Sequence, residues 1–333
     1  MQYRRMGKSG LKLSAITLGT LWFGSKVNEA ASIRIVHHAF DAGVNCIDTA
    51  DIYGKDRWDT PCRGPAEEIV GKALKGRRQS VVLATKVAAL TGPGANDRGL
   101  SRKHITEGVH ESLRRLQTDY IDIYYLHEPD YTTPLEESLE TLGDLVRQGK
   151  ILYIGLSNYY AWQVCKALWY ADKANLAGVA CIQMVYNLIA RDSELEMTRL
   201  CEAEGIGINA WGALAGGMLS GKYLECDPTQ PPPPGVKPYP ATWEPRYFEA
   251  VKRLQEIAGD RSLAQLSLAW LLHDPLVSSI VCGVSSVEQL EENLGALDLE
   301  LSADDLEACD EVWRRLRPTP TMFYARGYGI EFK

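Results

Sequence analysis

Long apolar segments are missing from this 333-residue sequence. No run approaches the ~20 apolar residues that a membrane-spanning helix needs, and the opening MQYRRMGKSG lacks the apolar core of a secretion signal. Clusters of basic residues are also missing, since 36 Lys and Arg are outnumbered by 43 Asp and Glu, for a net charge of −7. We therefore expect a soluble cytoplasmic protein that binds neither a membrane nor a nucleic acid.

Cysteine pairs with the spacing of a metal or redox motif are absent as well. The eight cysteines include no Cys-x-x-Cys pair. Several of them lie in apolar runs, such as Cys46 in VNCID and Cys282 in IVCGV. No cluster of His and Cys has metal-ligand spacing. We therefore expect buried free thiols in a reducing compartment, with no metal site and no disulfide framework.

The fingerprint Gly-x-Gly-x-x-Gly, which usually follows the first strand of a doubly wound dinucleotide-binding sheet, is absent. Short apolar runs instead alternate with amphipathic patterns, which indicates a parallel sheet with right-handed crossovers. Eight strand candidates favour an α/β fold of the (β/α)8 TIM barrel type. A doubly wound sheet is the alternative. The predicted strands are Ile16–Leu18, Cys46–Ile47, Val81–Ala84, Ile121–Tyr125, Tyr153–Gly155, Cys181–Met184, Gly207–Ala210 and Ser279–Val281. The predicted helices include Ala31–Ala42, Ala66–Leu74, Arg102–Leu116, Leu135–Arg147, Trp162–Ala174 and Glu194–Glu204.

Two segments depart from this alternation. Residues 2–15 predict an N-terminal β-hairpin around a turn at Lys8-Ser9-Gly10. Residues 227–246 include four consecutive prolines, Pro231–Pro234, and predict a long surface loop. Because this loop follows the seventh strand, we expect it on the catalytic face of the barrel, either as a lid or as a passive insertion. We expect residues 1–333 to form one barrel domain.

Polar side chains follow three neighbouring strands. Asp48 ends the second predicted strand, Lys86 the third and His127 the fourth, and Tyr53 comes shortly after Asp48. Taken singly, each has an ordinary structural explanation: a lone Lys at a strand end usually extends to water, a lone His often only stabilises a loop, and a Tyr can simply pack. Because active sites in such barrels lie at the C-terminal ends of the strands, the four together indicate a catalytic group at one mouth.

These residues and their surroundings resemble the aldo-keto reductase family. The likeness begins with MQYRRMGKSGLKLSAITLGT, includes IDTADIYG and GLSRKHITEGVHESLRRLQTDYIDIYYLHEPD, and ends with VCGVSSVEQLEENLGAL. It covers nearly the whole chain and is nearest to the branch that contains potassium-channel β-subunits and related bacterial reductases. The resemblance implies an oxidoreductase that moves a hydride between NADPH and a small-molecule carbonyl, reducing aldehydes or ketones to alcohols.

The resemblance also implies a role for each member of the tetrad. Tyr53 gives the proton. An ordinary Tyr has a pKa of ~10, and a neighbouring Lys86 ammonium favours the phenolate and lowers that pKa. Asp48 holds Lys86 in place and keeps it charged. His127 orients the carbonyl and stabilises the charge that develops on its oxygen.

Cofactor-binding positions carry over in the same way. The resemblance implies that Ser157, Asn158 and Gln183 hold the carboxamide of the nicotinamide and that Trp211 stacks beneath its ring. A helix that begins near Ser286 would direct its N-terminus at a phosphate. No Arg or Lys lies between Gly283 and Asn293, which leaves NAD as the alternative to the favoured NADPH. The expected cofactor set comprises Thr20, Ser157, Asn158, Gln183, Trp211, Gly212, Leu214, Gly216, Lys222, Gly283, Ser285, Gln289, Glu292 and Asn293.

The substrate pocket is the least defined part of the prediction. Trp22 and Trp58, together with Phe23, are candidate walls. Arg57 and Arg63 lie in the connection between residues 55 and 65. They fit either an anionic substrate or an ordinary surface loop.

Other functions remain open. The first alternative is a cofactor-binding regulatory subunit with weak catalysis, like the channel β-subunits, which have Asn where this chain has His127. A barrel hydrolase or lyase that uses Asp48 with Glu128 is a further alternative, but it leaves the cofactor segments unexplained. The sequence is compatible with a homo-oligomer.

Overall fold

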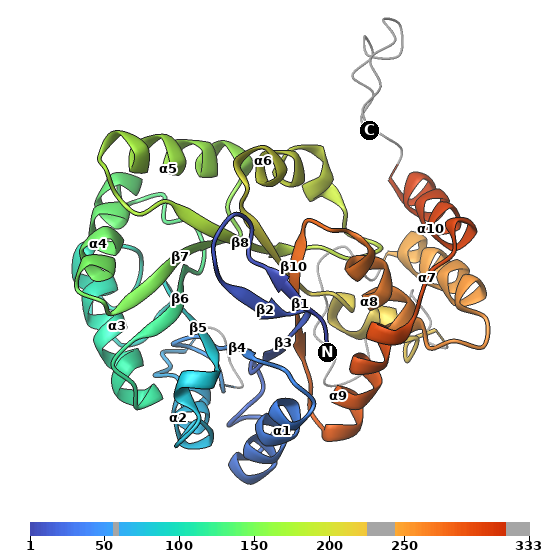
Figure 1. Cartoon of the computed structure of the whole chain (residues 1–333), viewed down its shortest axis with the longest axis horizontal. Coiled ribbons are helices and arrows are strands. Elements are labelled where there is room, and N and C mark those ends of the chain that lie inside the picture. Colours follow the sequence, from blue (N-terminus) through green and yellow to red (C-terminus); the bar gives the residue numbers. More distant parts are fainter. Residues whose placement is uncertain (56–59, 225–243, 318–333) are drawn as a thin grey trace, which may run out of the picture.

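The computed structural model describes residues 1–55, 60–224 and 244–317. Within these residues, eight parallel strands form a closed barrel in the order β10-β3-β4-β5-β6-β7-β8-β9, with helices around its outside (Figure 1). The predicted (β/α)8 barrel is confirmed. The doubly wound alternative is wrong, because the last strand pairs with the first strand of the barrel. The barrel strands are β3 (Ile16–Gly19), β4 (Cys46–Asp48), β5 (Val82–Val87), β6 (Ile121–Leu126), β7 (Ile151–Ser157), β8 (Val179–Val185), β9 (Gly207–Trp211) and β10 (Val277–Gly283).

The helices bury their apolar faces against the outside of the barrel. Among the described residues, none of them is both long and apolar enough to span a membrane. The predicted helix 194–204 is interrupted, because Glu196 at φ −139° and ψ −46° separates a 3-10 turn over Asp192–Leu195 from α6. The described helices are α1 (Glu29–Asp41), α2 (Pro65–Ala73), α3 (Arg102–Leu116), α4 (Leu135–Arg147), α5 (Ala161–Lys173), α6 (Met197–Glu204), α7 (Pro245–Ala258), α8 (Leu263–His273), α9 (Val287–Leu294) and α10 (Ala303–Leu316).

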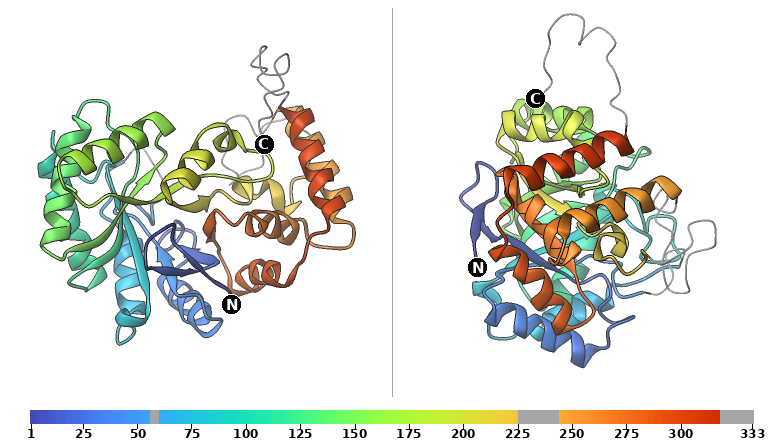
Figure 2. Two further views of the ribbon diagram at one scale, coloured as in Figure 1. Left: turned by 45° about the horizontal axis from the view of Figure 1, so that its top comes forward. Right: turned by 90° about the vertical axis from the view of Figure 1, so that its right-hand side faces the viewer.

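The predicted N-terminal hairpin is confirmed. Strands β1 (Tyr3–Arg5) and β2 (Lys12–Ser14) pair antiparallel and lie across one end of the barrel (Figures 1 and 2). Met6 and Leu13 are wholly buried and pack with Cys46 and Val82, which stand at the beginnings of β4 and β5. The hairpin therefore closes the end where the strands begin, and it leaves the opposite end for the polar residues.

Side chains alternate between the interior of the barrel and the surrounding helical layer, as the period of two in a strand requires. In β5, Val82 and Ala84 belong to the interior cluster, so Lys86 also points inward. By the same alternation, Asp48 lies two residues after the inward Cys46. The interior is closely filled there. A Cβ on Gly155 would lie 2.3 Å from the ring of Tyr125, so only glycine leaves room for that ring.

The predicted bounds of the Pro-rich loop, residues 227–246, extend two residues into a helix. Residues 227–243 lie outside the described residues, but Pro245 and Arg246 are the first residues of α7. Proline is tolerated there because the first N–H groups of a helix have no partner within the helix.

The cysteines of the described residues are free, and all of them are buried except Cys165. Burial raises the pKa of the Cys181 thiol to about 12. The expectation of buried thiols is therefore confirmed for all of them except Cys165, while Cys226 lies outside the described residues. In the same part of the chain, no group of three or more His, Cys, Asp or Glu residues is arranged to hold a metal ion.

Candidate active site

Four side chains converge at the C-terminal end of the barrel. Asp48 is the last residue of β4, Lys86 lies near the end of β5, and His127 directly follows β6, so all three leave adjacent strands at the same end. Tyr53 reaches them from the loop after β4. Lys86 Nζ lies 3.2 Å from Tyr53 Oη, and the rings of Tyr53 and His127 meet edge to face with their centroids 5.7 Å apart. The structure thus brings together the tetrad predicted from the sequence.

Lys86 lies at the centre of the hydrogen-bond network. It is 0% exposed, and its ammonium group contacts Asp48 Oδ1 and donates to the Thr49 carbonyl oxygen at 2.8 Å. A lysine extended to water is therefore the wrong interpretation of this residue. Burial lowers the pKa of Lys86, but Asp48 and Tyr53 outweigh that effect and raise the pKa above its ordinary value. Lys86 is consequently a cation at neutral pH.

Backbone geometry directs Tyr53 at this cation. The Tyr53 amide donates to the Ala50 carbonyl at 3.1 Å, and the next residue, Gly54, donates to the Leu21 carbonyl at 3.2 Å. Gly54 has φ +93°, and a Cβ at this position would lie 2.4 Å from the Phe23 carbonyl oxygen. Only glycine can therefore make this turn, which leaves the phenol of Tyr53 beside Lys86.

The pKa of Tyr53 differs from the sequence-based expectation. Burial raises its pKa above the ordinary value and Asp48 adds to the increase, while Lys86 lowers the pKa by a smaller amount than burial raises it. The expected net lowering by Lys86 is thus wrong for the chain by itself, because removing the phenolate from water costs more than the single neighbouring cation restores. Tyr53 remains a neutral phenol that still carries its proton.

His127 is partly buried and uncharged at neutral pH. Burial, together with the Lys86 cation, lowers its pKa to about 3. A neutral imidazole keeps one N–H donor and one acceptor nitrogen. His127 can therefore donate a hydrogen bond to an oxygen that enters between it and Tyr53.

The residues expected to hold the nicotinamide lie beside the tetrad. Asn158, at φ +63°, donates from Nδ2 to the His127 carbonyl at 2.9 Å and accepts at Oδ1 from Trp211 Nε1 at 3.1 Å. Ser157 accepts from the same Nδ2 at 3.1 Å. Asn158 thus joins the ends of β6, β7 and β9.

Two expected cofactor residues contact Asp48 directly. Gln183 Nε2 donates to Asp48 Oδ2 at 2.7 Å, and the Thr20 hydroxyl donates to the Asp48 carbonyl oxygen at 3.0 Å. Both residues are buried. The link from Gln183 to Asp48 was not predicted, and no local pattern signals it because the two residues are 135 positions apart.

The loop after β9 forms a cradle of backbone and one ammonium group. Gly212, Gly216 and Gly217 all have left-handed φ values, of 67°, 66° and 100°, and Leu214 directly precedes the 3-10 turn Ala215–Ser220. A Cβ on Gly217 would lie 2.8 Å from Lys222 Nζ. The Lys222 ammonium therefore lies close to the glycine backbone of this loop.

The segment after β10 is exposed at its beginning and buried at its end. Gly283, Ser285 and Gln289 are exposed, and both the amide and the hydroxyl of Ser285 are within hydrogen-bond distance of Gln289 Oε1, at 2.9 and 3.0 Å. Ser286 caps α9, as predicted. Asn293 is buried, and Glu292 accepts from the Ser262 hydroxyl at 2.8 Å. Two of the expected cofactor residues therefore have other contacts. Glu292 is bonded to Ser262, the residue that caps α8, and Asn293 lies in the interior.

Candidate substrate residues are only partly described. Trp22 is partly buried, with Lys26 Nζ 4.0 Å from its ring centroid. Phe23 is wholly buried in the main core and is not a pocket wall, contrary to expectation. Trp58 and Arg57 lie outside the described residues. Arg63 is exposed.

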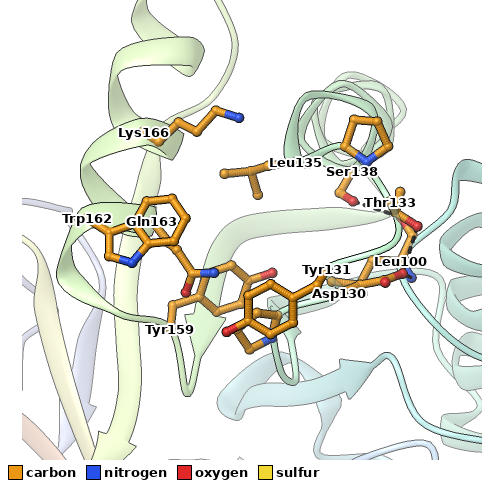
Figure 3. A pocket seen from close by; sticks show the side chains of 12 residues that line it. Leu100, Asp130, Tyr131, Thr133, Leu135, Ser138, Tyr159, Trp162, Gln163 and Lys166 are labelled. Carbon is orange, nitrogen blue, oxygen red and sulfur yellow. Dashed lines mark hydrogen bonds between the residues drawn. The ribbon is translucent and has the colours of Figure 1, made fainter.

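Two pockets flank the loop between β6 and α4. One encloses about 220 Å³ between this loop and α5, with Tyr131, Tyr159 and Trp162 among its walls (Figure 3). The other encloses about 550 Å³ between the same loop and the one before α3, with Arg98 and Glu128 among its walls. The tetrad side chains line neither pocket, so both lie beside the mouth that holds the tetrad and not within it.

Comparison with known proteins agrees with this geometry. The sequence pattern of the aldo/keto reductase family matches residues 15–314. A probable voltage-gated potassium channel subunit beta of Arabidopsis thaliana is 37% identical over 310 residues, which cover 90% of this chain and 92% of the relative. A protein of Bacillus subtilis (strain 168), named as an uncharacterized oxidoreductase, is 36% identical over 323 residues, which cover 94% of this chain and 96% of the relative. The chain belongs to the aldo/keto reductase family.

Proposed function

We propose that this chain is an NADPH-dependent reductase that converts aldehydes or ketones to alcohols. The contact of the buried Lys86 ammonium with both Asp48 and Tyr53 carries the proposal. A buried lysine that only filled space would be costly. Here it is paired, charged and placed against the phenol of Tyr53 at the mouth of the barrel, which is the arrangement that proton transfer to a carbonyl oxygen requires.

The chain's own residues supply the proton and stabilise the charge. Tyr53 gives its hydroxyl proton to the carbonyl oxygen, and Lys86 stabilises the phenolate that is left. The N–H of neutral His127 donates a hydrogen bond to the same oxygen as negative charge develops on it. Asp48, held by Gln183, keeps the Lys86 ammonium aligned. The reduced nicotinamide, when bound, supplies the hydride to the carbonyl carbon.

The described residues fit a dinucleotide at the same end of the barrel. Ser157 and Asn158 offer amide and hydroxyl groups beside the tetrad, and Trp211 offers a partly exposed ring. Lys222 lies over the backbone of Gly217, where a pyrophosphate would find both a cation and N–H groups. Ser285 lies on the exposed segment after β10, where we place the adenosine end.

The direct test is NADPH oxidation by the purified protein in the presence of a reactive aldehyde such as a nitrobenzaldehyde. We expect aldehyde-dependent loss of NADPH absorbance with one alcohol formed per cofactor oxidised. The same assay with NADH measures cofactor preference. NADPH binding without aldehyde-dependent oxidation across a panel of aldehydes, ketones and sugars would contradict the proposal.

That contrary result would support a second function, a regulatory subunit that binds the cofactor without significant catalysis. The name of the Arabidopsis relative, a probable voltage-gated potassium channel subunit beta, favours this alternative. The complete tetrad around Lys86 favours catalysis. We therefore place the reductase first.

The neutrality of His127 has a measurable consequence. Because the pKa of His127 is lowered to about 3, we expect kcat to show no inflection near the ordinary histidine value of ~6.5. The measurement is kcat with saturating NADPH from pH 5 to pH 8. His127→Gln keeps an N–H donor but cannot titrate, so it should have a lower rate with the same pH profile. A fall in kcat as pH rises through ~6.5 that vanishes in this variant would show that His127 acts as a charged acid, contrary to the prediction.

The adenosine end can be tested at Ser285. We expect Ser285→Asp to weaken NADPH binding far more than NADH binding, because it places a like charge beside the 2′-phosphate. Fluorescence titration with both cofactors gives the ratio of the two dissociation constants, and Ser285→Asn is the neutral control of similar size. Equal weakening of both cofactors by the Asp variant would place the 2′-phosphate elsewhere.

A further inference from the structure

A buried cluster of charged groups extends from the tetrad toward α2 and α3. Its members lie on β4, on the loop after it, and on α2, β5 and α3, and none is more than 4% exposed. Three of them are acids and two are bases, so full ionisation would leave one uncompensated negative charge away from water. The members are Asp48, Asp51, Glu67, Lys86 and Arg115.

Two of the three acids have partners that explain their charge. Asp48 contacts Lys86 and accepts from Gln183. Glu67 Oε2 accepts from Arg115 Nε at 2.7 Å, and its Oε1 accepts from the Thr85 hydroxyl at 2.5 Å. Both bases of the cluster are thus engaged with these two acids. Arg115 has a further acidic neighbour at 3.5 Å, the half-exposed Glu111.

Asp51 is the acid without a partner. It is 1% exposed, and neither of its carboxyl oxygens accepts a hydrogen bond within the described part of the chain. The hydroxyls of Tyr124 and Ser112 are also buried there without partners. A carboxylate in such a place would keep none of the hydrogen bonds that water gave it, whereas a neutral carboxyl group loses much less.

We propose that Asp51 is retained as a neutral carboxylic acid in the folded protein, and that its proton compensates the charge of the buried cluster behind Tyr53. A neutral carboxyl can donate one hydrogen bond and accept others, either directly or through one enclosed water. It therefore supports the loop that carries Tyr53 without adding a negative charge beside the proton donor. The part of the proposal that concerns Tyr53 rests on the proposed reductase function.

The surrounding charges agree with this assignment. Burial raises the pKa of the Asp51 carboxyl well above its ordinary value, and Glu67 on α2 adds to the increase. Arg115 on α3, Lys86 on β5 and Lys55 in the loop oppose it by less. Tyr124 on β6 also faces the cluster, and burial, with the neighbouring Glu67, raises its pKa, so it offers a neutral hydroxyl.

Infrared spectroscopy tests the proton directly and does not depend on activity. We expect the spectrum of wild type minus Asp51→Asn, at neutral pH in D2O, to contain the carbonyl stretch of a protonated carboxyl group. Asp122→Asn, which removes a buried aspartate that accepts from Arg78 at 2.7 Å outside the cluster, is the matched control and should leave that band in place. If the band is absent and the melting temperature depends on potassium or sodium, a bound cation compensates the cluster and the proposal is wrong.

The pH dependence of stability provides an independent measurement. An unfolded Asp ionises above a pKa of ~4, while the folded Asp51 keeps its proton, so wild type should lose stability with rising pH relative to Asp51→Asn. The unfolding equilibrium constants of the two proteins, from denaturant titration, should diverge by about tenfold per pH unit until the folded carboxyl ionises. A constant ratio between pH 4 and pH 7 would overturn the proposal.

The effect on the catalytic centre is read from kcat profiles. Asp51→Ala removes the hydrogen-bonding group and should lower kcat by about tenfold to a hundredfold. Asp51→Asn should keep most of the wild-type kcat.

The pH profile of kcat tests the charge of Asp51. The basic limb of kcat should lie at the same pH in wild type and Asp51→Asn. A limb moved to lower pH in Asp51→Asn would show that wild-type Asp51 carries a negative charge that raises the pKa of Tyr53, contrary to the proposal. The infrared and stability measurements use no aldehyde, so they still test the protonation of Asp51 if the proposed reductase function is wrong.

Discussion

Replacement of Tyr53 by Phe is expected to reduce kcat for carbonyl reduction by about 10²–10⁴, the loss that follows removal of a general acid. The change deletes only the hydroxyl that accepts a hydrogen bond from Lys86 Nζ at 3.2 Å. Tyr53 lies in a loop at the mouth of the barrel, and its backbone hydrogen bonds to Ala50 and Ala66 remain. The fold should therefore tolerate the substitution.

Cofactor binding separates a catalytic role from a structural one. We expect the dissociation constant for NADPH to change little in Tyr53→Phe, because the candidate contacts other than Thr20 come from β7 to β10 and the loops that follow them. Fluorescence titration of NADPH, paired with steady-state kinetics, gives both quantities. Aldehyde reduction at a near wild-type rate would remove Tyr53 from the proton-donor role. Loss of NADPH binding would show instead that Tyr53 holds the site together.

Lys86→Met should have the second large effect, on both rate and stability. The variant removes the cation that stabilises the Tyr53 phenolate, so the pKa of Tyr53 should rise further and its proton should become harder to give. It also leaves Asp48 buried, with Gln183 as its remaining side-chain donor. Breaking a buried ion pair in this way typically costs about 3–5 kcal/mol of stability.

The double variant Lys86→Met with Asp48→Asn tells these two effects apart. It removes both charges, so we expect it to recover most of the lost stability and none of the lost kcat.

The pH of the stability measurement also matters. Because the pKa of Lys86 is raised in the folded protein, the stability that Lys86 contributes is fully present below the unfolded lysine pKa of ~10.4. That contribution is lost as pH rises through the folded value. Denaturant titration at neutral pH therefore measures the full effect, and a Lys86→Met protein as active as wild type would contradict the mechanism.

The site could be predicted from sequence to the extent that barrel topology determines it. Asp48, Lys86 and His127 each follow a short apolar run, and the C-terminal ends of parallel strands in a closed barrel meet at one mouth. Tyr53 follows Asp48 by only five positions, so a short loop was enough to place it. Family resemblance then supplied the roles that spacing alone leaves open.

Charge states could not be predicted in this way. The expected lowering of the Tyr53 pKa by Lys86 was wrong in its net direction, because burial raises that pKa by more. The sequence names the neighbouring cation, but it does not give the amount of water that packing removes from the phenol. The same reason explains His127, whose low pKa arises first from burial.

The sequence by itself determined the order of strands and helices, and this order determined the barrel. It also determined that Asp48 and Lys86 point inward, because side chains alternate between the two faces of a strand and this alternation is a local property. Only the tertiary structure decided which partners those side chains found. Gln183 contacts Asp48 across 135 residues, Arg115 reaches Glu67 across 48, and the Asp51 carboxyl accepts no hydrogen bond from any residue that the structure describes. These outcomes depend on the register and packing of elements far apart in the chain, which no local pattern encodes.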